Sequence, residues 1–171
     1  GNQANGAVAR LLPDGTPDAS FDGDGVVQVS FGTTHQARFA AVAVRGDRIV
    51  AAGTYGSDVA VARLHDDGRL DASFSGDGKL VESVGGADGV AEVIEEPGTS
   101  RIVLVGDAGT GTPARLRPAL MRLTADGEVD TSFGDGGKVI LEVPGGEPTA
   151  WQRGSAVTLD AEGRILVAGM D

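Results

Sequence analysis

The sequence has no cysteine and very few aromatic residues. The lack of cysteine excludes disulfide bonds, thiolate catalysis and cysteine-based zinc sites, although it leaves the redox compartment of the protein open. Aromatic residues make up 4% of the chain, and Trp151 is its one tryptophan. Apolar runs are short, and none approaches the roughly 20 residues that a membrane-spanning helix needs. We therefore expect no membrane insertion.

Basic residues are scarce relative to acidic ones. Fourteen Lys and Arg residues stand against 25 Asp and Glu residues, which gives a net charge of −11. A charge of this sign repels nucleic acids, so nucleic acid is not an expected partner. The sequence begins at Gly1 rather than at a methionine, which we interpret as a processed or trimmed end that is compatible with secretion.

Glycine and short apolar runs, in contrast, are plentiful. The chain has 28 glycines, and 40% of its residues are hydrophobic, a share that is ordinary for a globular protein. Many glycines between short apolar runs indicate strands joined by turns, and no segment of ten or more residues has helical periodicity. The predicted fold class is all-β.

The sequence repeats itself three times. The pattern R-L-x-x-D-G-x-x-D-[AT]-S-F occurs at residues 10–21, 63–74 and 122–133. A second pattern, which begins R-I and ends in glycine, occurs at residues 48–53, 101–106 and 164–169. Two independent patterns at nearly the same period of roughly 53 to 63 residues exclude an accidental similarity, and such periods are typical of propellers and solenoids.

Each period contains four strand-like runs. In the copy that begins at Arg101 they are residues 102–105, 119–123, 138–143 and 155–159. Four short antiparallel strands at this period predict β-propeller blades, in which each sheet covers the faces of its neighbours. We therefore predict a single domain over residues 1–171, built from repeats at about 7–53, 54–106 and 107–169, with half-blades at the two ends.

The phase of the repeat suggests how the ends are used. The sequence starts in a second strand at residues 7–11 and ends just after a first strand at residues 164–169. Three blades are fewer than the about 4 to 8 that close a propeller. The chain is therefore either a fragment that joins the remaining blades of the same parent protein, which is our preferred interpretation, or half of a ring completed by a second copy.

The repeats also resemble a known family. The motif R-L-x-x-D-G-x-x-D-x-S-F-x-x-D-G-K-V, followed by an R-I-V-V-A-G strand, resembles the delta-60 repeat family of bacterial β-propeller proteins, and it is best matched over residues 71–79. The third copy departs from the motif at residues 134–137. The resemblance implies a propeller in a large bacterial protein that is secreted or exposed at the cell surface. It implies no defined activity.

An arginine, an aspartate and a phenylalanine recur in every copy. The arginine precedes the aspartate by eight residues and could form either a repeated anion or sugar site or a structural ion pair. Residues that recur in every blade mostly build the blade, so we favour the ion pair and expect the phenylalanines to be buried between blades. These residues are Arg10, Asp18 and Phe21, then Arg63, Asp71 and Phe74, then Arg122, Asp130 and Phe133.

Short Gly-Asp segments follow each phenylalanine. Their carboxylates, from Asp22, Asp24, Asp77 and Asp135, are hard oxygen ligands of the kind that Ca²⁺ prefers. However, the complete calcium-loop motif is absent, and the acidic position shifts in the third copy. Turns entering the next strand are the favoured interpretation, and we predict no cofactor.

The copies differ most in two loops, and insertions in repeat proteins often form the binding face. One loop, at residues 107–118, carries Arg115 and Arg117, and the other, at residues 144–153, carries Trp151 and Arg153. Trp151 either stacks on a sugar or protein partner or caps the core of a blade.

The sequence contains no catalytic constellation. We therefore predict a non-catalytic binding or scaffold module that contacts a protein or a glycan, secreted or at the cell surface of a bacterium. Two alternatives stay open. One is a lectin or glycan-active enzyme, because the many acidic residues could supply the two facing carboxylates that a glycosidase needs. The other is a structural fragment that completes a larger propeller.

Overall fold

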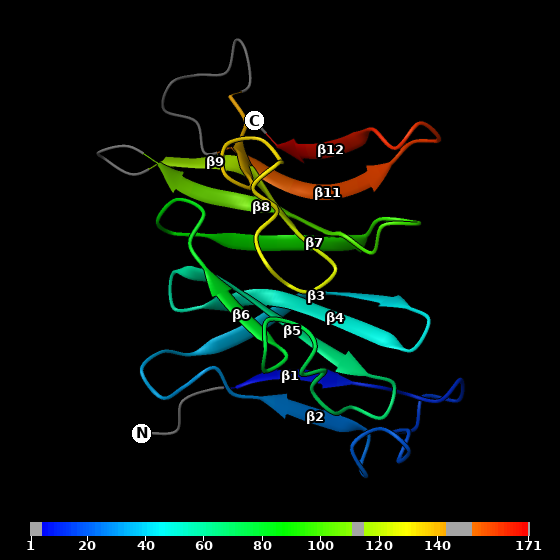
Figure 1. Cartoon of the computed structure of the whole chain (residues 1–171). Coiled ribbons are helices and arrows are strands. Elements are labelled where there is room, and N and C mark those ends of the chain that lie inside the picture. Colours follow the sequence, from blue (N-terminus) through cyan, green and yellow to red (C-terminus); the bar gives the residue numbers. More distant parts are fainter. Residues whose placement is uncertain (1–4, 111–114, 143–151, 171) are drawn as a thin grey trace.

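The computed structural model describes residues 5–110, 115–142 and 152–170. These residues form twelve β-strands in four antiparallel sheets, and they contain no helix. The sheets lie one above the other in sequence order, so that the N-terminal and C-terminal strands are at opposite ends of the stack (Figure 1). Within the described residues there is no helical segment with the length and hydrophobicity that crossing a membrane requires.

Two of the sheets are complete four-stranded blades. The first has the order β3 (Ala37–Arg45), β4 (Arg48–Tyr55), β5 (Asp58–His65) and β6 (Lys79–Glu82). The second has the order β7 (Gly89–Glu95), β8 (Ile102–Thr110), β9 (Arg115–Leu123) and β10 (Lys138–Ile140). In both blades, strands that follow each other in the sequence are neighbours in the sheet. The all-β prediction, with its propeller-type blades, is confirmed.

The other two sheets are two-stranded. At one end of the stack, β1 (Gly6–Ala9) pairs with β2 (Val26–Val29). At the other end, β11 (Arg153–Leu159) pairs with β12 (Ile165–Met170). By sequence and pairing, β1 and β2 correspond to the third and fourth strands of a complete blade. In the same way, β11 and β12 correspond to the first and second strands.

The blade boundary differs from the predicted one. Residues 155–159 were expected to be the fourth strand of a period, but they lie in β11, which is a first strand and forms a hairpin with β12. The same hairpin joins β3 to β4, where Arg45 lies opposite Arg48. A periodic pattern fixes the repeat length but has no intrinsic starting point, and the blade begins where consecutive strands stop pairing, as between β6 and β7.

The middle strands carry the core. β4, β5, β8 and β9 are buried on both faces. This burial explains why their sequences are continuous apolar runs rather than alternations of apolar and polar residues. The largest cluster lies between the two complete blades and includes Val61, Phe74, Leu104 and Met121. Each blade thus shields the apolar face of the next one from water.

The glycine that ends each R-I motif allows a bulge in the preceding strand. Residues opposite Gly53 shift register between Phe39 and Ala41, and residues opposite Gly106 shift between Val90 and Glu92. A Cβ atom on either glycine would overlap the carbonyl oxygen of the bulged strand. The motif glycine is therefore required by a close approach of two backbones.

Candidate functional site

The repeated arginines and aspartates form ion pairs within their own blades. In all three copies the arginine Nε lies 2.8 Å from the aspartate Oδ2, in the pairs Arg10–Asp18, Arg63–Asp71 and Arg122–Asp130. The arginine lies at the end of the third strand, and the aspartate lies in the long connection to the fourth. The pair therefore ties this connection to the sheet.

The serine two residues after each aspartate completes the local network. Ser73 donates from its hydroxyl and from its backbone N–H to Asp71 Oδ1, at 2.6 and 3.0 Å, and its hydroxyl accepts a bond from Arg63. Burial raises the pKa of Asp71, but these hydrogen bonds and the charge of Arg63 outweigh it and leave the pKa below its ordinary value. Hydrogen bonds from Ser20 and Ser132 likewise lower the pKa of Asp18 and Asp130.

The same arginines also connect neighbouring blades. Arg10 Nη1 donates to the backbone oxygen of Asp66 at 2.6 Å, and Arg63 Nη1 donates to the backbone oxygen of Ala125. Both acceptors lie in the Asp-Gly turn of the next blade. Because the guanidinium donors are bound within the fold, the structural interpretation fits better than a repeated anion or sugar site.

Each repeated phenylalanine lies under its arginine. The guanidinium carbon is 4.9, 4.8 and 4.5 Å from the ring centre in the pairs Arg10–Phe21, Arg63–Phe74 and Arg122–Phe133. Phe21 and Phe74 are completely buried, whereas Phe133 is only partly buried. The phenylalanines therefore act as plugs between blades in two of the three copies.

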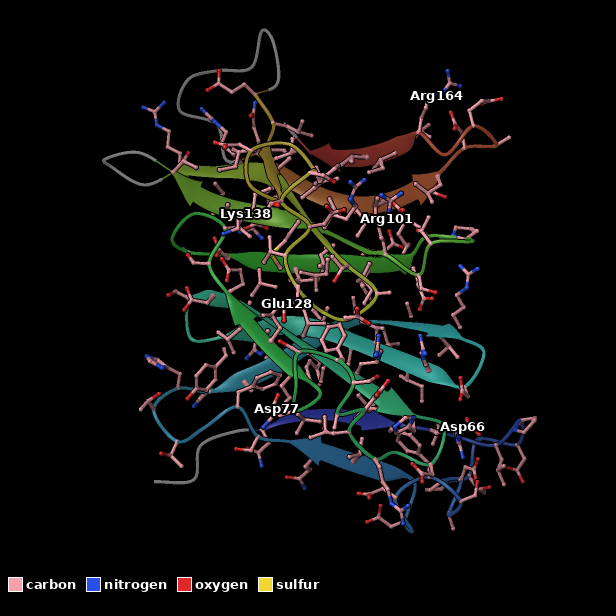
Figure 2. All side chains as sticks on the ribbon, viewed as in Figure 1. Asp66, Asp77, Arg101, Glu128, Lys138 and Arg164 are labelled. Carbon is pink, nitrogen blue, oxygen red and sulfur yellow. The ribbon has the colours of Figure 1, made fainter. Side chains whose placement is uncertain are left out.

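Lysines add a second contact between blades, at the other side of the stack. Lys138 Nζ lies 2.6 Å from Glu82 Oε1 and 2.5 Å from the backbone oxygen of Ser83 in the preceding blade. Lys79 donates to the backbone oxygen of Ser30 in the equivalent way. Figure 2 shows Lys138 on one side of the stack, while Asp66, Arg101 and Arg164 lie on the opposite side.

The aspartates considered as calcium ligands make turns. Asp24 Oδ1 accepts the backbone N–H of Val26, and Asp77 Oδ1 accepts that of Lys79. Asp22 adopts a left-handed conformation with φ of 52°. Asp135 begins a backbone turn with Lys138. Over residues 5–110, 115–142 and 152–170, no group of three or more ligating side chains comes together to hold a metal ion.

Several charged residues lie near the starts of β9 and β11. Arg117 Nη1 donates to Gln152 Oε1 at 3.4 Å, and Gln152 also binds the backbone of Leu116. Burial raises the pKa of Asp107, while Arg153 opposes this shift and Asp88 adds to it. The structure thus brings Arg117 of the second complete blade near the start of β11, where Arg153 lies. The prediction of a loop over residues 107–118 is wrong for most of its length, because β8 extends to Thr110 and both Arg115 and Arg117 lie in β9. Trp151 lies outside the described residues.

Sequence reasoning missed two acidic residues near Arg153, Asp88 and Asp107. Asp88 is buried and accepts backbone N–H groups from Val84, Gly85 and Gly86, which organises the connection between the two complete blades. In the alignment of the repeats, Asp107 occupies the position that corresponds to Thr54 of the other complete blade. A carboxylate where another copy has a threonine was the available signal for Asp107, whereas nothing in the repeat pattern marks Asp88.

Hollows of different size lie on the described surface. One of about 680 Å³ is lined by Ala7 of β1, by Arg38 of β3 and by Gln36 just before β3. A second of about 490 Å³ lies at the opposite side of the stack near Glu96 and Arg122. A third of about 230 Å³ lies between β1 and β3.

Comparison with known proteins identifies the repeat but no relative of established activity. Residues 1–21, 47–74 and 100–133 match a family model described as a β-propeller domain of unknown function, DUF5122. No curated protein matches the chain. The matched segments contain the Arg-Leu and Asp-Ser-Phe motifs of all three copies. The chain is therefore similar, in each of its three repeats, to the DUF5122 β-propeller domain, and its fold is that of propeller blades.

Proposed function

We propose that the chain is a non-catalytic binding module of a β-propeller. In this proposal, the surface near Arg117 and Arg153 contacts a protein or glycan that presents acidic groups. The observation that carries this proposal is that the repeated arginines and the non-repeated arginines lie in different surroundings. The arginines that recur in all copies bind carboxylates and backbone oxygens that build the blades, whereas Arg115 and Arg117 lie where the copies differ, and Arg117 donates to Gln152 there.

The arrangement of the first strands supports this choice of face. β3, β7 and β11 lie side by side through the stack. Arg38 and Arg153 are at equivalent positions of β3 and β11, because both lie one residue before the position that faces the motif glycine. Together with Arg117, they place three arginines on one side of the stack, where Asp88 and Asp107 also lie. In a chain whose net charge is −11, these arginines are the groups on this side that attract the acidic groups of a partner.

A pair of charged polymers tests this proposal. Polygalacturonate serves as an acidic glycan, poly-L-glutamate as an acidic peptide, and dextran as a neutral control. We expect binding to at least one acidic polymer, weakened at least about 5-fold in the Arg117→Ala, Arg153→Ala double variant, since a coupling of this size is ordinary for paired charges. The binding should also weaken with added salt.

Arg69→Ala, Arg164→Ala is the matched control. Both arginines are highly exposed and lie in turns at the opposite side of the stack, so their loss changes the net charge by the same two units without touching the proposed face (Figure 2). Equal binding by the Arg117→Ala, Arg153→Ala variant and the original chain would contradict the proposal, as would the absence of binding to both acidic polymers. The setting we propose, a secreted or surface-exposed bacterial protein, rests on the resemblance of the repeats.

A further inference from the structure

Aspartate followed directly by glycine recurs throughout the chain. Such pairs begin at Asp14, Asp22, Asp24, Asp67, Asp77, Asp88, Asp126 and Asp135. In an Asp-Gly pair the backbone nitrogen of the glycine can attack the side-chain carboxyl carbon, because glycine has no Cβ atom to hinder the approach. All of these pairs have the same intrinsic chemistry, so their surroundings in the fold decide which of them react.

The reaction of such a pair needs only water. A bond forms between the glycine nitrogen and Cγ of the aspartate, and the carboxyl OH leaves as water with the proton that the nitrogen gives up. The product is a five-membered cyclic imide. Water then reopens this ring at either carbonyl, which restores aspartate or produces isoaspartate, in which the main chain runs through Cγ and is longer by one methylene group.

Two hydrogen bonds oppose this reaction in half of the pairs. One reaches the carboxylate from the backbone N–H two residues later and holds Cγ in place, as Thr16 does for Asp14 at 2.9 Å. The other is donated by the glycine N–H, which must lose its proton before the nitrogen attacks, and in Gly15 it reaches the backbone oxygen of Leu12 at 2.9 Å. The same two bonds restrain the pairs that begin at Asp24, Asp67 and Asp77.

Two further pairs have one restraint of this kind. Asp88 is buried, and its carboxylate accepts three backbone N–H groups from the preceding residues. After Asp126, the N–H of Gly127 donates to the backbone oxygen of Thr124 at 3.1 Å. Each of these pairs is therefore held by the fold at the carboxyl group or at the nitrogen.

The pairs Asp22-Gly23 and Asp135-Gly136 have neither restraint. Over the residues that the structure describes, no group donates to the carboxylate of Asp22 or Asp135, and neither glycine N–H has an acceptor in the protein. All four residues are exposed, and nothing lies within 4 Å of the Cβ position of Gly23 or Gly136. The carboxyl carbon and the nitrogen are therefore free to approach each other.

We propose that Asp22 and Asp135 are sites of spontaneous isomerisation to isoaspartate, whereas the fold protects the other Asp-Gly pairs. In a protected pair the turn must open before the nitrogen can attack, so the rate falls with the population of the open turn. Breaking two hydrogen bonds reduces that population by about 10-fold, and breaking one reduces it by about 5-fold.

Isomerisation at either site changes a turn that borders a junction between blades. The N–H of Asp22 donates to the backbone oxygen of Asp67 in the next blade at 3.0 Å. Lys138, which closes the turn that begins at Asp135, binds Glu82 of the preceding blade. An extra methylene group lengthens these turns, and we expect the modified chain to unfold at a lower urea concentration.

Peptide mapping of the folded chain tests the proposal, because trypsin keeps protected and unprotected aspartates in the same peptide. Residues 11–38 contain Asp14, Asp22 and Asp24, and residues 123–138 contain Asp126 and Asp135. The chain is incubated in heavy-oxygen water at mildly acidic pH, which maintains a fraction of the neutral carboxyl group. Each imide that reopens takes up the label, and electron-transfer fragmentation locates isoaspartate within the peptide.

The expected result is a site-specific pattern. Isoaspartate should form at Asp22 about 10-fold faster than at Asp14 and Asp24, and at Asp135 about 5-fold faster than at Asp126. In concentrated urea the turns are absent, so all five should react at similar rates. The pair Asn5-Gly6 can form the same imide, but it lies in the separate tryptic peptide of residues 1–10.

Asp22→Ser is the matched variant. Ser75 occupies the equivalent position of a complete blade with φ of 50°, close to the 52° of Asp22, so the variant should keep the fold. Its signal at residue 22 should disappear while that at Asp135 persists. A loss of both signals would overturn the proposal, because the label would then not arise from the two sites independently.

Three outcomes of the mapping itself would also overturn the proposal. Equal rates for all five aspartates in the folded chain would mean that the sequence, and not the fold, sets the reactivity. Faster reaction at Asp14 or Asp126 than at their unprotected neighbours would reverse the assignment. The third is a folded chain without isoaspartate at Asp22 and Asp135 after a time that produces it in urea.

Discussion

Gly127 lies directly over the ring of Phe74 in the preceding blade. A Cβ atom on Gly127 would be 2.6 Å from Cδ2 of Phe74, and Phe74 is completely buried. The glycine also has a positive φ of 85°. The Asp-Gly turn therefore serves two purposes, because it reverses the chain and allows two blades to approach closely.

The first prediction separates these two purposes. Gly127→Ala should destabilise the chain by about 1 to 3 kcal/mol more than Gly76→Ala, as expected for overpacking. Gly76 has nearly the same φ, 84°, but nothing within 4 Å of its Cβ position, so it reports the backbone cost alone. Urea unfolding measures both variants. Equal losses would mean that the contact with Phe74 does not restrict the turn.

The second prediction concerns the buried ion pair. Arg63→Met should lower the free energy of unfolding by about 3 kcal/mol, because it leaves the carboxylate of Asp71 buried without its partner. Arg69→Met, in an exposed turn of the same blade, should change it by less than about 0.5 kcal/mol. A small loss in Arg63→Met would show that solvent reaches Asp71 in place of the arginine.

The third prediction concerns acid. The folded-state pKa of Asp71 is lowered, so its contribution to stability is complete above its unfolded pKa, about 3.9, and is lost as the pH falls through the folded pKa. We expect Asp71→Asn to be less stable than the original chain at neutral pH and to lose less stability on acidification below about pH 4.

Ser73→Ala provides the matching test for the origin of this shift. It keeps the carboxylate of Asp71 but removes the hydroxyl that donates to it, so the acid transition should move to higher pH. Urea midpoints measured from neutral pH to below pH 4 would follow both variants. Identical pH profiles for the original chain and Asp71→Asn would exclude Asp71 as a contributor.

The fourth prediction compares equal side chains at equivalent positions. Leu64→Ala should cost about 3 kcal/mol, because Leu64 is fully buried. Leu11→Ala should cost less than about 0.5 kcal/mol when the unfolding of a monomeric sample is measured, since Leu11 is largely exposed within one chain.

The sequence predicted the repeat length, the strand content and the ion pairs, because each depends on residues that recur at fixed spacing. It did not predict which strand begins a blade, since that depends on where consecutive strands stop pairing, as β6 and β7 do. The role of Asp88 could not be predicted either, because it depends on three backbone N–H groups whose direction is known only after the chain folds. The non-repeated loops were the least predictable part.

The shortness of the outermost strands has a consequence for how this protein avoids fibres. β2, β6 and β10 have four, four and three residues, and they form the outer rim of their sheets. Edge strands this short offer few unpaired backbone groups with which a strand of another chain could pair, and this is a common protection against aggregation. The outer surface therefore discourages the endless stacking of sheets that repetitive β-proteins would otherwise invite.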